Sequence, residues 1–428
     1  MPDTPLPTRA LTIRGQSLYV RRFAVTVSAG PDAGRRIESS RDELTIGTDP
    51  SNDLHLTDPS VSRHHCVLRA TERGLEVRDL GSTNGTVCGA VEVVRAYLTG
   101  NGELVLGRTK VTVERLDSEI ASALAGVDRM GELVGSSPAM RRMYALLARY
   151  AETEGTVLIT GETGTGKELA AEAIHAASAR RDQPFVVVDC SALPGQLSES
   201  ELFGHVRGAF TGADADRVGA LARAQHGTVF LDEIGELPLA LQPLLLRALE
   251  ARTIRPIGSD REISLDIRVI AATHRDLRTE VNRKRFRSDL YFRLSVLQVE
   301  MPPLRERDGD TEILVQHLWQ QLRPGGVAPK EVVSGLARLD WPGNVRELRN
   351  AVERAATIGV QRGVVEALTT SALSYGEAKL VAVDVWEARW VAELIATHAG
   401  NLSAAARAAR MGRSNLRGLL RKHGVELD

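Results

Sequence analysis

A glycine-rich stretch ending in lysine is the first candidate for chemistry in this chain. The stretch GETGTGKE comprises Gly161, Glu162, Thr163, Gly164, Thr165, Gly166, Lys167 and Glu168. It lies between an apolar segment and a helical one, where glycine amides and a helix N-terminus can bind phosphate. Lys167 would reach the β- and γ-phosphates of a nucleotide. The general motif ends in Ser or Thr, which coordinate magnesium, and Glu168 departs from it, so a chance Gly-rich turn is the alternative.

Two carboxylates about 65 residues downstream complete a possible hydrolytic site. Asp232 and Glu233 end the apolar segment TVFLDE. Asp232 suits Mg²⁺, and Glu233 suits a base or an orienting group for an attacking water, because phosphoryl transfer depends mainly on positioning and charge neutralisation. The alternative is that both carboxylates only end a strand and cap the next helix. Together with the upstream loop, the pair indicates nucleotide hydrolysis.

Apolar and helical segments alternate around these residues and predict a parallel α/β core. The expected strands are VLIT, FVVVDC, TVFLDE and IRVIAAT, with helices between them, and IRVIAAT closes the series. The chain becomes helical after MPPLRER, which predicts a lid. We place the α/β core at 131–300 and the α-helical lid at 301–365.

With these residues in place, the segment 131–365 resembles the AAA+ domain of sigma-54-dependent transcription activators, the bacterial enhancer-binding proteins. The stretch GAFTGA carries the resemblance and comprises Gly208, Ala209, Phe210, Thr211, Gly212 and Ala213. In that family the loop projects from a ring and contacts sigma-54, with its Phe and Thr essential, and the phosphate loop also ends in GTGKE. The resemblance implies an ATPase that uses ATP and Mg²⁺ and remodels sigma-54 RNA polymerase holoenzyme. Phe210 would be an exposed aromatic anchor; the alternative is an ordinary turn with a buried Phe.

The same resemblance gives roles to three arginines. Arg287 and Arg293 in FRSDLYFRL stand at arginine-finger positions, and Arg346 in WPGNVREL stands at the sensor II position. Arginine suits these roles because it is permanently charged and can bind phosphate oxygens with two donors. Fingers act on a neighbour's nucleotide, so they imply a homo-oligomeric ring, commonly a hexamer in the family. Without the motif match, these arginines would more often be surface salt-bridge partners.

Two positions depart from the family pattern. Many relatives have Asn where Asp189 precedes Cys190, and many have Asn where His274 follows Thr273 in the sensor I segment. In the family the first Asn donates a hydrogen bond to the Walker B glutamate and acts as a switch. An ionised Asp189 cannot donate and would repel Glu233. We therefore expect an intact catalytic set with altered coupling between hydrolysis and loop movement.

Short alternating apolar segments separated by Gly, Asn, Asp and Pro predict a β-sandwich at 23–116. The stretches SVSRHHCVL and VRDLGSTNGT resemble a forkhead-associated (FHA) domain, which binds phosphothreonine peptides. The candidate phosphopeptide residues are Ser62, Arg63, Ser82, Thr83 and Asn84. Many such domains have Arg after the strand glycine, whereas Thr48 follows Gly47 here. The resemblance implies a phosphothreonine protein or a serine/threonine kinase as partner; a dimerisation or phospho-independent docking module is the alternative.

The C-terminal segment 384–428 has helix-turn-helix spacing. A first helix is expected to bury Trp386, Trp390, Val391, Leu394 and Ile395. A second helix begins at Ser403, Met411-Gly412 makes the turn, and Ser414 is the expected N-cap of a third helix that buries Leu416, Leu419 and Leu420. The segment resembles the Fis-type domain that ends most of these activators and implies binding to enhancer DNA. The candidate contacts are Arg413, Ser414, Asn415, Arg417 and Arg421; a solvated basic helix is the alternative.

The composition limits the class of protein and the partners that can be expected. The 428 residues are 43% hydrophobic and 25% charged, as in globular proteins, and the net charge of −1 limits nucleic-acid contact to a local patch. No run approaches 18 apolar residues, and the three cysteines lack metal-ligand spacing, so we expect a cytoplasmic protein without membrane contact. The stretches 1–22, 117–130 and 366–383 are expected to be an extension, a linker or short helix, and a second linker.

The combined prediction is a multidomain, signal-responsive ATPase and DNA-binding activator. A DNA-binding scaffold or repressor that scarcely turns over nucleotide is one alternative, and the complete set of catalytic residues argues against it. An unrelated AAA+ unfoldase or chaperone is another, against which GAFTGA and the terminal helices count.

Overall fold

The computed structural model describes residues 11–14, 17–71, 73–192, 198–358, 375–398 and 400–423. The chain forms two compact units, Met1–Asp310 and Thr311–Asp428. Within the described residues, no helix is long and apolar enough to cross a membrane.

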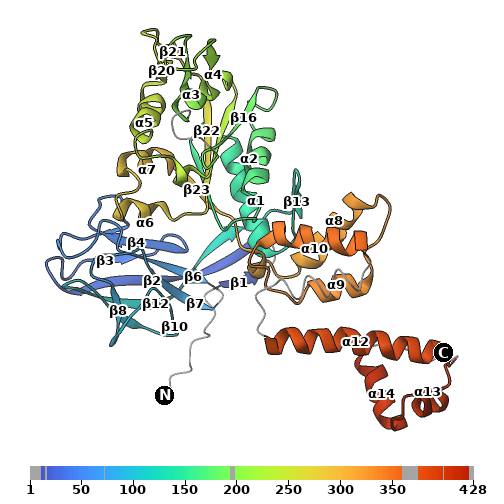
Figure 1. Cartoon of the computed structure of the whole chain (residues 1–428). Coiled ribbons are helices and arrows are strands. Elements are labelled where there is room, and N and C mark those ends of the chain that lie inside the picture. Colours follow the sequence, from blue (N-terminus) through green and yellow to red (C-terminus); the bar gives the residue numbers. More distant parts are fainter. Residues whose placement is uncertain are drawn as a thin grey trace. The chain divides into compact units, whose positions relative to one another are not determined.

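The first unit begins with a β-sandwich (Figure 1). One sheet has the order β1-β2-β12-β11-β8-β9, with β3 paired to β2, and the other has the order β10-β7-β6-β4-β5. The first sheet contains β1 (Leu11–Arg14), β2 (Ser17–Ala29), β3 (Arg36–Glu38), β8 (Thr86–Cys88), β9 (Val91–Glu92), β11 (Gly102–Leu106) and β12 (Thr109–Ala123). The second contains β4 (Glu43–Gly47), β5 (Leu54–His55), β6 (Cys66–Thr71), β7 (Gly74–Asp79) and β10 (Arg95–Leu98).

The sandwich core forms because alternate residues of strands in both sheets point inward. Val25 and Val111 from one sheet and Leu68 and Val77 from the other are fully buried. The sequence pattern therefore predicted this part of the fold correctly.

The strands of the sandwich extend beyond the predicted bounds. β12 continues past a bulge to Ala123, where it pairs with Ser17 of β2. The stretch 117–123 is thus strand rather than linker or short helix, because the neighbouring strand supplies backbone partners that sequence periodicity does not reveal. Part of the expected N-terminal extension is strand for the same reason.

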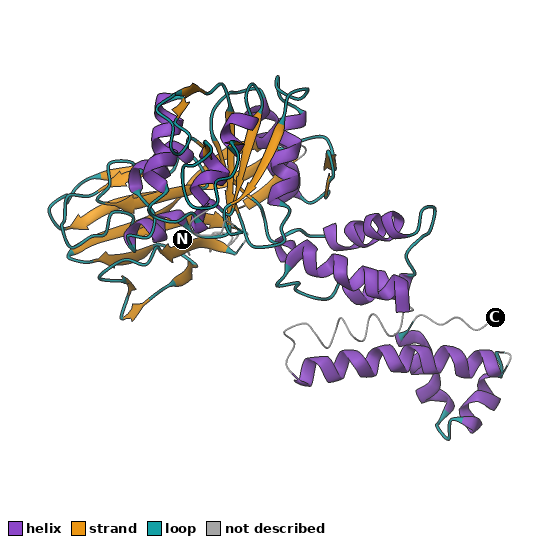
Figure 2. Ribbon diagram, turned by 45° about the horizontal axis from the view of Figure 1, so that its top comes forward, coloured by secondary structure: helices purple, strands orange, loops and turns teal. Residues whose placement is uncertain are grey.

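A parallel five-stranded sheet with the order β16-β19-β22-β15-β23 forms the α/β part of the first unit. Figure 2 shows its strands between helices. Its strands are β15 (Val157–Thr160), β16 (Phe185–Asp189), β19 (Thr228–Asp232), β22 (Arg268–Thr273) and β23 (Leu297–Glu300). The four predicted strands are confirmed. The fifth, β23, was missed because LQVE is short and has only one buried residue.

The remaining elements of this part surround the sheet or form small hairpins. The helices are α1 (Pro138–Ala151), α2 (Lys167–Ala176), α3 (Ser198–Phe203), α4 (Ala220–Arg223), α5 (Gln242–Ala251), α6 (Leu277–Asn282) and α7 (Ser288–Leu294), with 3-10 turns η1 (Ile234–Glu236) and η2 (Leu304–Glu306). The short strands pair as β13 (Arg129–Met130) with β14 (Leu133–Val134), β17 (Gly204–His205) with β18 (Arg217–Val218), and β20 (Thr253–Ile254) with β21 (Ile263–Ser264). Cys66 and Cys190 are buried and Cys88 is partly buried, and all three are free thiols.

Helices follow the sheet, as predicted for the lid. They are α8 (Asp310–Leu322), α9 (Lys330–Leu336) and α10 (Asn344–Ile358). Trp341 lies in the segment that connects α9 to α10. Its side chain is buried, and its indole N–H donates to the carbonyl of Leu336. Residues 359–374, which include the predicted end of the lid, lie outside the described part of the chain.

The C-terminal helices are α12 (Tyr375–Thr397), α13 (Leu402–Ala408) and α14 (Arg413–Lys422). They bury a common cluster that includes Val391, Ile395, Leu416 and Leu420, with Leu419 packed against it. α12 begins inside the stretch 366–383 that was expected to be a linker.

Two predicted details of these helices are wrong. Trp386 is 59% exposed and stacks on Trp390, so it does not lie on the core face. Ser414 lies within α14, and Gly412 is the N-cap because the helix starts two residues earlier than predicted. Asn401, by contrast, caps α13 by accepting from the N–H groups of Ser403 and Ala404.

Candidate active site

The glycine-rich loop connects β15 to α2 and curls through left-handed backbone. Gly161, Gly164 and Gly166 have φ values of 146°, 81° and 100°. A Cβ on Gly161 would lie 2.9 Å from the carbonyl oxygen of Met301, so a side chain fits poorly there. α2 begins at Lys167, directly after the loop. The loop therefore has the strand-loop-helix setting that a phosphate site requires.

The ammonium group of Lys167 lies at the loop and close to a carboxylate. It donates to the carbonyl oxygens of Gly161 at 3.1 Å and Glu162 at 3.3 Å, and it lies 3.5 Å from Glu233 Oε1. Lys167 is only 8% exposed, so the charge is held in place. The structure thus brings the predicted lysine and the predicted Walker B glutamate together.

Two arginines near the loop were missed from the sequence. Arg305 forms a bidentate pair with Glu162, at 2.8 and 2.6 Å. Arg307 donates to the carbonyl oxygens of Thr165 and Pro302, and burial lowers its pKa to about 10. Both follow the apolar MPPL in the sequence, which gave no sign of contact with a loop about 140 residues earlier.

Asp232 ends β19 beside Asp189 of β16, because the two strands are parallel and in register. Burial raises the pKa of Asp232, although the N–H of Glu233 donates to its Oδ1. Glu233 has a left-handed φ of 47°. Burial would raise the pKa of Glu233, but hydrogen bonds from His274 and the charge of Lys167 outweigh it and lower the pKa.

Asp189 binds its own turn. Its Oδ1 accepts from the N–H and hydroxyl of Ser191, at 2.8 and 2.6 Å, and from the N–H of Ala192 at 3.3 Å. These bonds, led by that of the Ser191 hydroxyl, lower its pKa. The partner of Glu233 is instead His274, whose N–H and ring Nδ1 lie 3.1 and 2.7 Å from Glu233 Oε2.

The sequence marked His274 as a departure at the sensor I position and predicted no partner for its side chain. Thr273, the preceding sensor residue, is buried, and its hydroxyl oxygen accepts from the N–H of Arg275.

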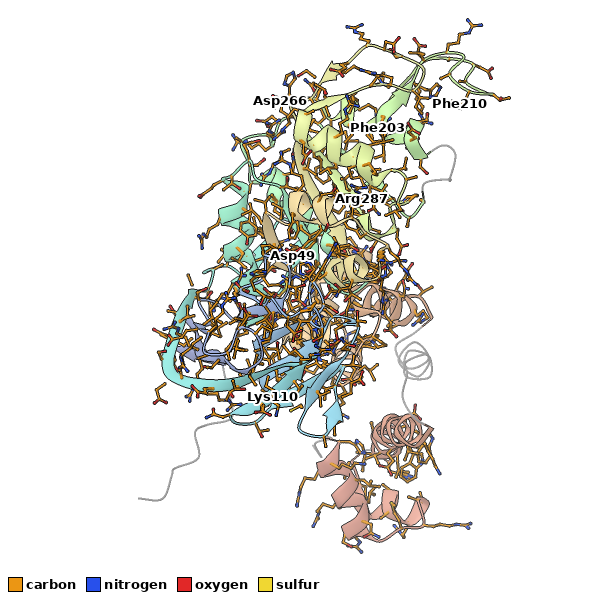
Figure 3. All side chains as sticks on the ribbon, turned by 90° about the vertical axis from the view of Figure 1, so that its left-hand side faces the viewer. Asp49, Lys110, Phe203, Phe210, Asp266 and Arg287 are labelled. Carbon is orange, nitrogen blue, oxygen red and sulfur yellow. The ribbon has the colours of Figure 1, made fainter. Side chains whose placement is uncertain are left out.

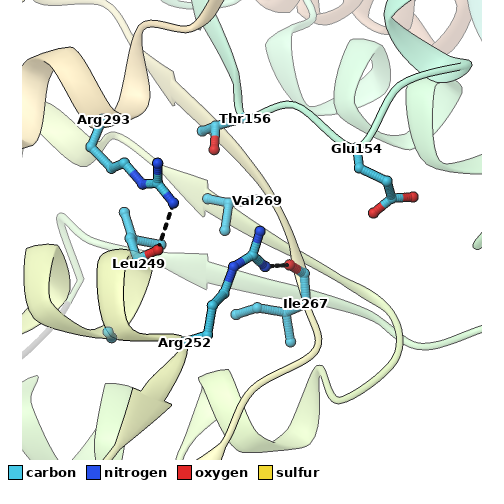
Figure 4. A pocket seen from close by; sticks show the side chains of 8 residues that line it. Glu154, Thr156, Leu249, Arg252, Ile267, Val269 and Arg293 are labelled. Carbon is cyan, nitrogen blue, oxygen red and sulfur yellow. Dashed lines mark hydrogen bonds between the residues drawn. The ribbon is translucent and has the colours of Figure 1, made fainter.

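The two finger candidates lie at the ends of α7. Arg287 precedes the helix, is exposed, and pairs with Asp289 at 3.1 and 2.7 Å. Arg293 lies in the last turn and donates to the carbonyl oxygen of Leu249 at 2.9 Å. Figure 4 shows Arg293 lining a small pocket that also includes Arg252 and Val269. Arg346, the sensor II candidate, is exposed in the first turn of α10 in the second unit.

The GAFTGA loop is a tight turn between β17 and β18. The N–H of Gly208 donates to the carbonyl of Ala213, and the N–H of Ala213 donates to the carbonyl of Phe210. Thr211 is exposed, but Phe210 is only partly exposed because its ring packs edge-on against His205, with ring centroids 4.9 Å apart. The expectation of a freely exposed aromatic is therefore wrong for this state. Figure 3 shows Phe210 at the opposite end of the first unit from Lys110 of the sandwich.

The candidate phosphopeptide residues gather on two adjacent loops of the sandwich. The N–H of Thr83 donates to Ser62 Oγ at 2.9 Å, and Asn84 Nδ2 donates to the carbonyl of Ser60 at 2.7 Å. Arg63 is exposed. Ser82 instead bonds Asp79, which places its hydroxyl in the turn.

The buried ring of His65 supports these loops. Its Nδ1 accepts from the N–H of Ser62 at 3.1 Å, and its Nε2 donates to the carbonyl of Gly85 at 3.1 Å. The loops therefore have an internal scaffold that holds their polar groups in place.

The candidate DNA contacts lie on one helix. Arg413, Ser414, Asn415, Arg417 and Arg421 of α14 are all exposed, whereas Leu416 and Leu420 are buried. The helix therefore presents a polar, basic face to solvent.

Comparison with known families matches three segments of the chain. Residues 133–300 match the sigma-54 interaction domain, and residues 305–374 match an AAA+ ATPase lid domain. Residues 26–117 match the family described as the cytoplasmic domain of an inner membrane component of T3SS.

Individual relatives extend these matches. The transcriptional regulatory protein GlrR of Escherichia coli K12 is 36% identical over 418 residues, which cover 94% of this chain and 91% of that protein. ZraR of Salmonella typhimurium is 47% identical over 264 residues, covering 60% of this chain but only 58% of ZraR. The crystal structure of NtrX from Brucella abortus in complex with ADP has a TM-score of 0.51 and 32% identity, with 70% of each chain covered.

Proposed function

Because the chain belongs to the family of sigma-54-dependent transcriptional regulators, we propose that it hydrolyses ATP to remodel sigma-54 RNA polymerase holoenzyme and open promoter DNA. The observation that carries this proposal is the meeting of Lys167, Asp232 and Glu233 at one edge of the sheet, in a chain that also presents the GAFTGA turn.

The described residues fit a nucleotide with Mg²⁺. The amides of 161–168 and the ammonium of Lys167 would hold phosphate oxygens, and Asp232 would hold the metal, which supplies charge neutralisation when bound. Lys167 already bonds carbonyls of the loop, so its charge is poised at the phosphate position. Glu233 accepts from His274 and is held ionised, as a base or water-orienting group must be.

Arg287 and Arg293 would act on the nucleotide of a neighbouring subunit. Within the described residues, their hydrogen bonds and ion pairs go to Asp289 and Leu249 and not to the phosphate loop. A homo-oligomeric ring, commonly a hexamer, would supply the missing arginine to each site, and Arg346 would complete the nucleotide contacts from the lid.

Phe210 and Thr211 would contact sigma-54. The turn from Gly208 to Ala213 is closed by its own hydrogen bonds, so it can move as one piece with the nucleotide state. Phe210 would leave His205 when the loop engages its partner, since the contact is between two rings at the surface and not in the core.

Two further functions are proposed for the ends of the chain. α14 would read enhancer DNA in the major groove through Arg413, Asn415 and Arg417, because these side chains are exposed on a helix whose opposite face is buried. The sandwich would receive a phosphothreonine signal through Ser62, Arg63, Thr83 and Asn84. Titration with phosphorylated and unphosphorylated threonine peptides tests this input: preference for the phosphorylated form supports it, and equal affinity contradicts it.

The central proposal is tested by transcription in vitro. Purified chain, enhancer DNA and sigma-54 holoenzyme are combined with ATP or a non-hydrolysable analogue, with sigma-70 holoenzyme as the control. Open complexes should form only with sigma-54 and hydrolysable ATP. Open complexes without hydrolysis, or only with sigma-70, would contradict the proposal.

A further inference from the structure

One asparagine of the α/β part binds both candidate phosphopeptide loops of the sandwich. Asn282, the last residue of α6, donates from Nδ2 to the carbonyl oxygens of His64 at 2.5 Å and Leu80 at 3.0 Å. Its Oδ1 accepts from the N–H of His64 at 3.4 Å. A single side chain therefore uses both ends of its amide to hold the two loops together.

These two loops carry the polar groups proposed to bind the phosphopeptide. His64 is two residues after Ser62 and next to Arg63. Leu80 is three residues before Thr83. The hydrogen bond from the N–H of Thr83 to Ser62 Oγ links the same loops a second time. A ligand that displaces either loop would therefore act on the bonds to Asn282.

His64 packs against α7, the helix that has one arginine-finger candidate near each end. Its ring is 5.7 Å from the ring of Tyr291 and 6.2 Å from that of Phe292, and the residue is 1% exposed. Both aromatic residues belong to α7, which Arg287 precedes and whose last turn contains Arg293. The sandwich is therefore in direct contact with the arginine-bearing helix.

Among the residues that the structure describes, four ion pairs join the sandwich to the α/β part around this contact. They are Glu43–Arg278 at 2.8 Å, Asp42–Arg142 at 2.9 Å, Arg78–Asp276 at 3.2 Å and Arg69–Glu300 at 2.5 Å. The side chains of the first two pairs are at most 27% exposed, so solvent screens them less than ordinary surface pairs. Each surface supplies both acids and bases, which fixes how the surfaces meet.

We propose that this contact is a docking surface through which the peptide-binding loops restrain α7. In the docked form the exposed Arg287 pairs with Asp289 and Arg293 bonds Leu249, so the placement of both guanidinium groups follows that of α7. Phosphopeptide binding loosens the loops from Asn282, and α7 with its arginines is released. The inference rests on the proposed ATPase and phosphothreonine functions and adds the surface that couples them.

Charge reversal in the full-length chain tests the docking. Glu43→Arg and Asn282→Ala should each raise basal ATP turnover roughly fivefold or more, as expected for an allosteric coupling of about 1 kcal/mol. The double variant Glu43→Arg/Arg278→Glu should return turnover toward that of the wild type, because the ion pair is rebuilt with opposite polarity. Glu103→Arg is the matched control, since Glu103 pairs only with the exposed Lys110 within the sandwich among the ion pairs of the described residues.

Hydrogen exchange supplies a readout that does not depend on hydrolysis. In Glu43→Arg and Asn282→Ala, the amide of His64 and the amides of α7 should exchange faster than in the wild type, and Glu103→Arg should leave them unchanged. Unchanged exchange and turnover in both interface variants would overturn the proposal.

Phosphothreonine peptides separate this inference from the proposed signal input. Peptides that stimulate turnover in the wild type but not in Asn282→Ala support the coupling. Equal stimulation of both chains overturns it. If no peptide binds the wild type, the phosphothreonine input fails, while turnover and exchange in the interface variants still decide whether the surfaces dock and restrain α7.

Discussion

Two hydrogen-bond donors of His274 bind the carboxylate of Glu233. Its backbone N–H lies 3.1 Å and its ring Nδ1 2.7 Å from the same oxygen, Oε2. An ionised carboxylate only accepts hydrogen bonds, so the ring carries its proton on Nδ1. Oε1 faces the ammonium of Lys167 at 3.5 Å. Glu233 is thereby oriented by the sensor strand on one side and by the phosphate loop on the other.

Replacing His274 with Ala should lower the kcat for ATP by about tenfold or more, because Glu233 loses the ring that orients it and a positioned base contributes at least this much. The dissociation constant for ATP should change little, since His274 has no contact with the phosphate loop among its described hydrogen bonds and ion pairs. Steady-state turnover and nucleotide binding measure the two effects separately.

His274→Asn is the matched control for this prediction. Its amide can still donate to Glu233, so it should retain more activity than Ala. If both variants turn over ATP like the wild type, Glu233 does not depend on this histidine.

Asp189→Asn should preserve or raise ATP turnover. The Asn oxygen can accept the same bonds from Ser191 and Ala192, and the change removes a negative charge next to Asp232. The turn should therefore persist while the amide gains a donor for Glu233. A clear loss of turnover, with ATP affinity and thermal stability unchanged, would show that the carboxylate itself is required.

Much of this fold and site could be predicted because their signals are local. The strand-loop-helix around Lys167, the strand ending in Asp232 and the buried face of α14 all follow from neighbouring residues. Residues that act through long-range contacts were missed, as with Arg305 and Arg307 on the phosphate loop. The interactions of Asp189 were also not predictable from its residue type. The side chain could interact with its own turn or with Glu233, and the residue type alone does not decide between them.

Asp310→Ala should destabilise the first unit by about 2–4 kcal/mol, as expected when buried donors lose a charged acceptor. Asp310 is fully buried, and its carboxylate accepts from the N–H groups of Ser136 and Ser137 and from the Ser137 hydroxyl, at 2.7 to 2.8 Å. Ser137 in turn caps α1. Urea denaturation followed by circular dichroism measures the change.

Asp310→Asn keeps one acceptor oxygen and should cost less than Ala. Equal stability of the wild type and the Ala variant would mean that water replaces the carboxylate at the start of α1.

Arg417→Ala should weaken binding to specific enhancer DNA by roughly 1–3 kcal/mol if the side chain contacts a base edge. Arg417 is exposed between the buried Leu416 and Leu420, so its removal should leave the helical core intact. Fluorescence anisotropy with specific and scrambled DNA at matched salt measures the effect. Lys379→Ala, an exposed basic change on α12, is the control. Equal loss on both DNAs would indicate a phosphate contact, and no loss would place the reading surface elsewhere.

His64 should make the stability of the docked first unit fall as pH decreases from about 6.5 to about 4. Burial lowers its pKa from the ordinary 6.5 to about 4, which the nearby charges of Asp49 and Arg278 modify in opposite directions. Between these values the unfolded chain binds a proton that the folded chain does not, so the free energy of unfolding decreases with falling pH. The slope from one such group approaches about 1.4 kcal/mol per pH unit.

His64→Gln isolates this contribution, because it removes the titrating ring and leaves the other buried histidines, His65 and His175, in place. The free energy of unfolding of both chains is measured by urea denaturation at intervals from pH 7.5 to pH 4.5. The wild type should lose more stability than the variant across this window, and the difference should vanish above pH 7.5, where both folded and unfolded His64 are neutral. Parallel curves would show that protonated His64 is accommodated at the docked surface, for example by turning toward solvent its Nε2, which has no hydrogen-bond partner among the described residues.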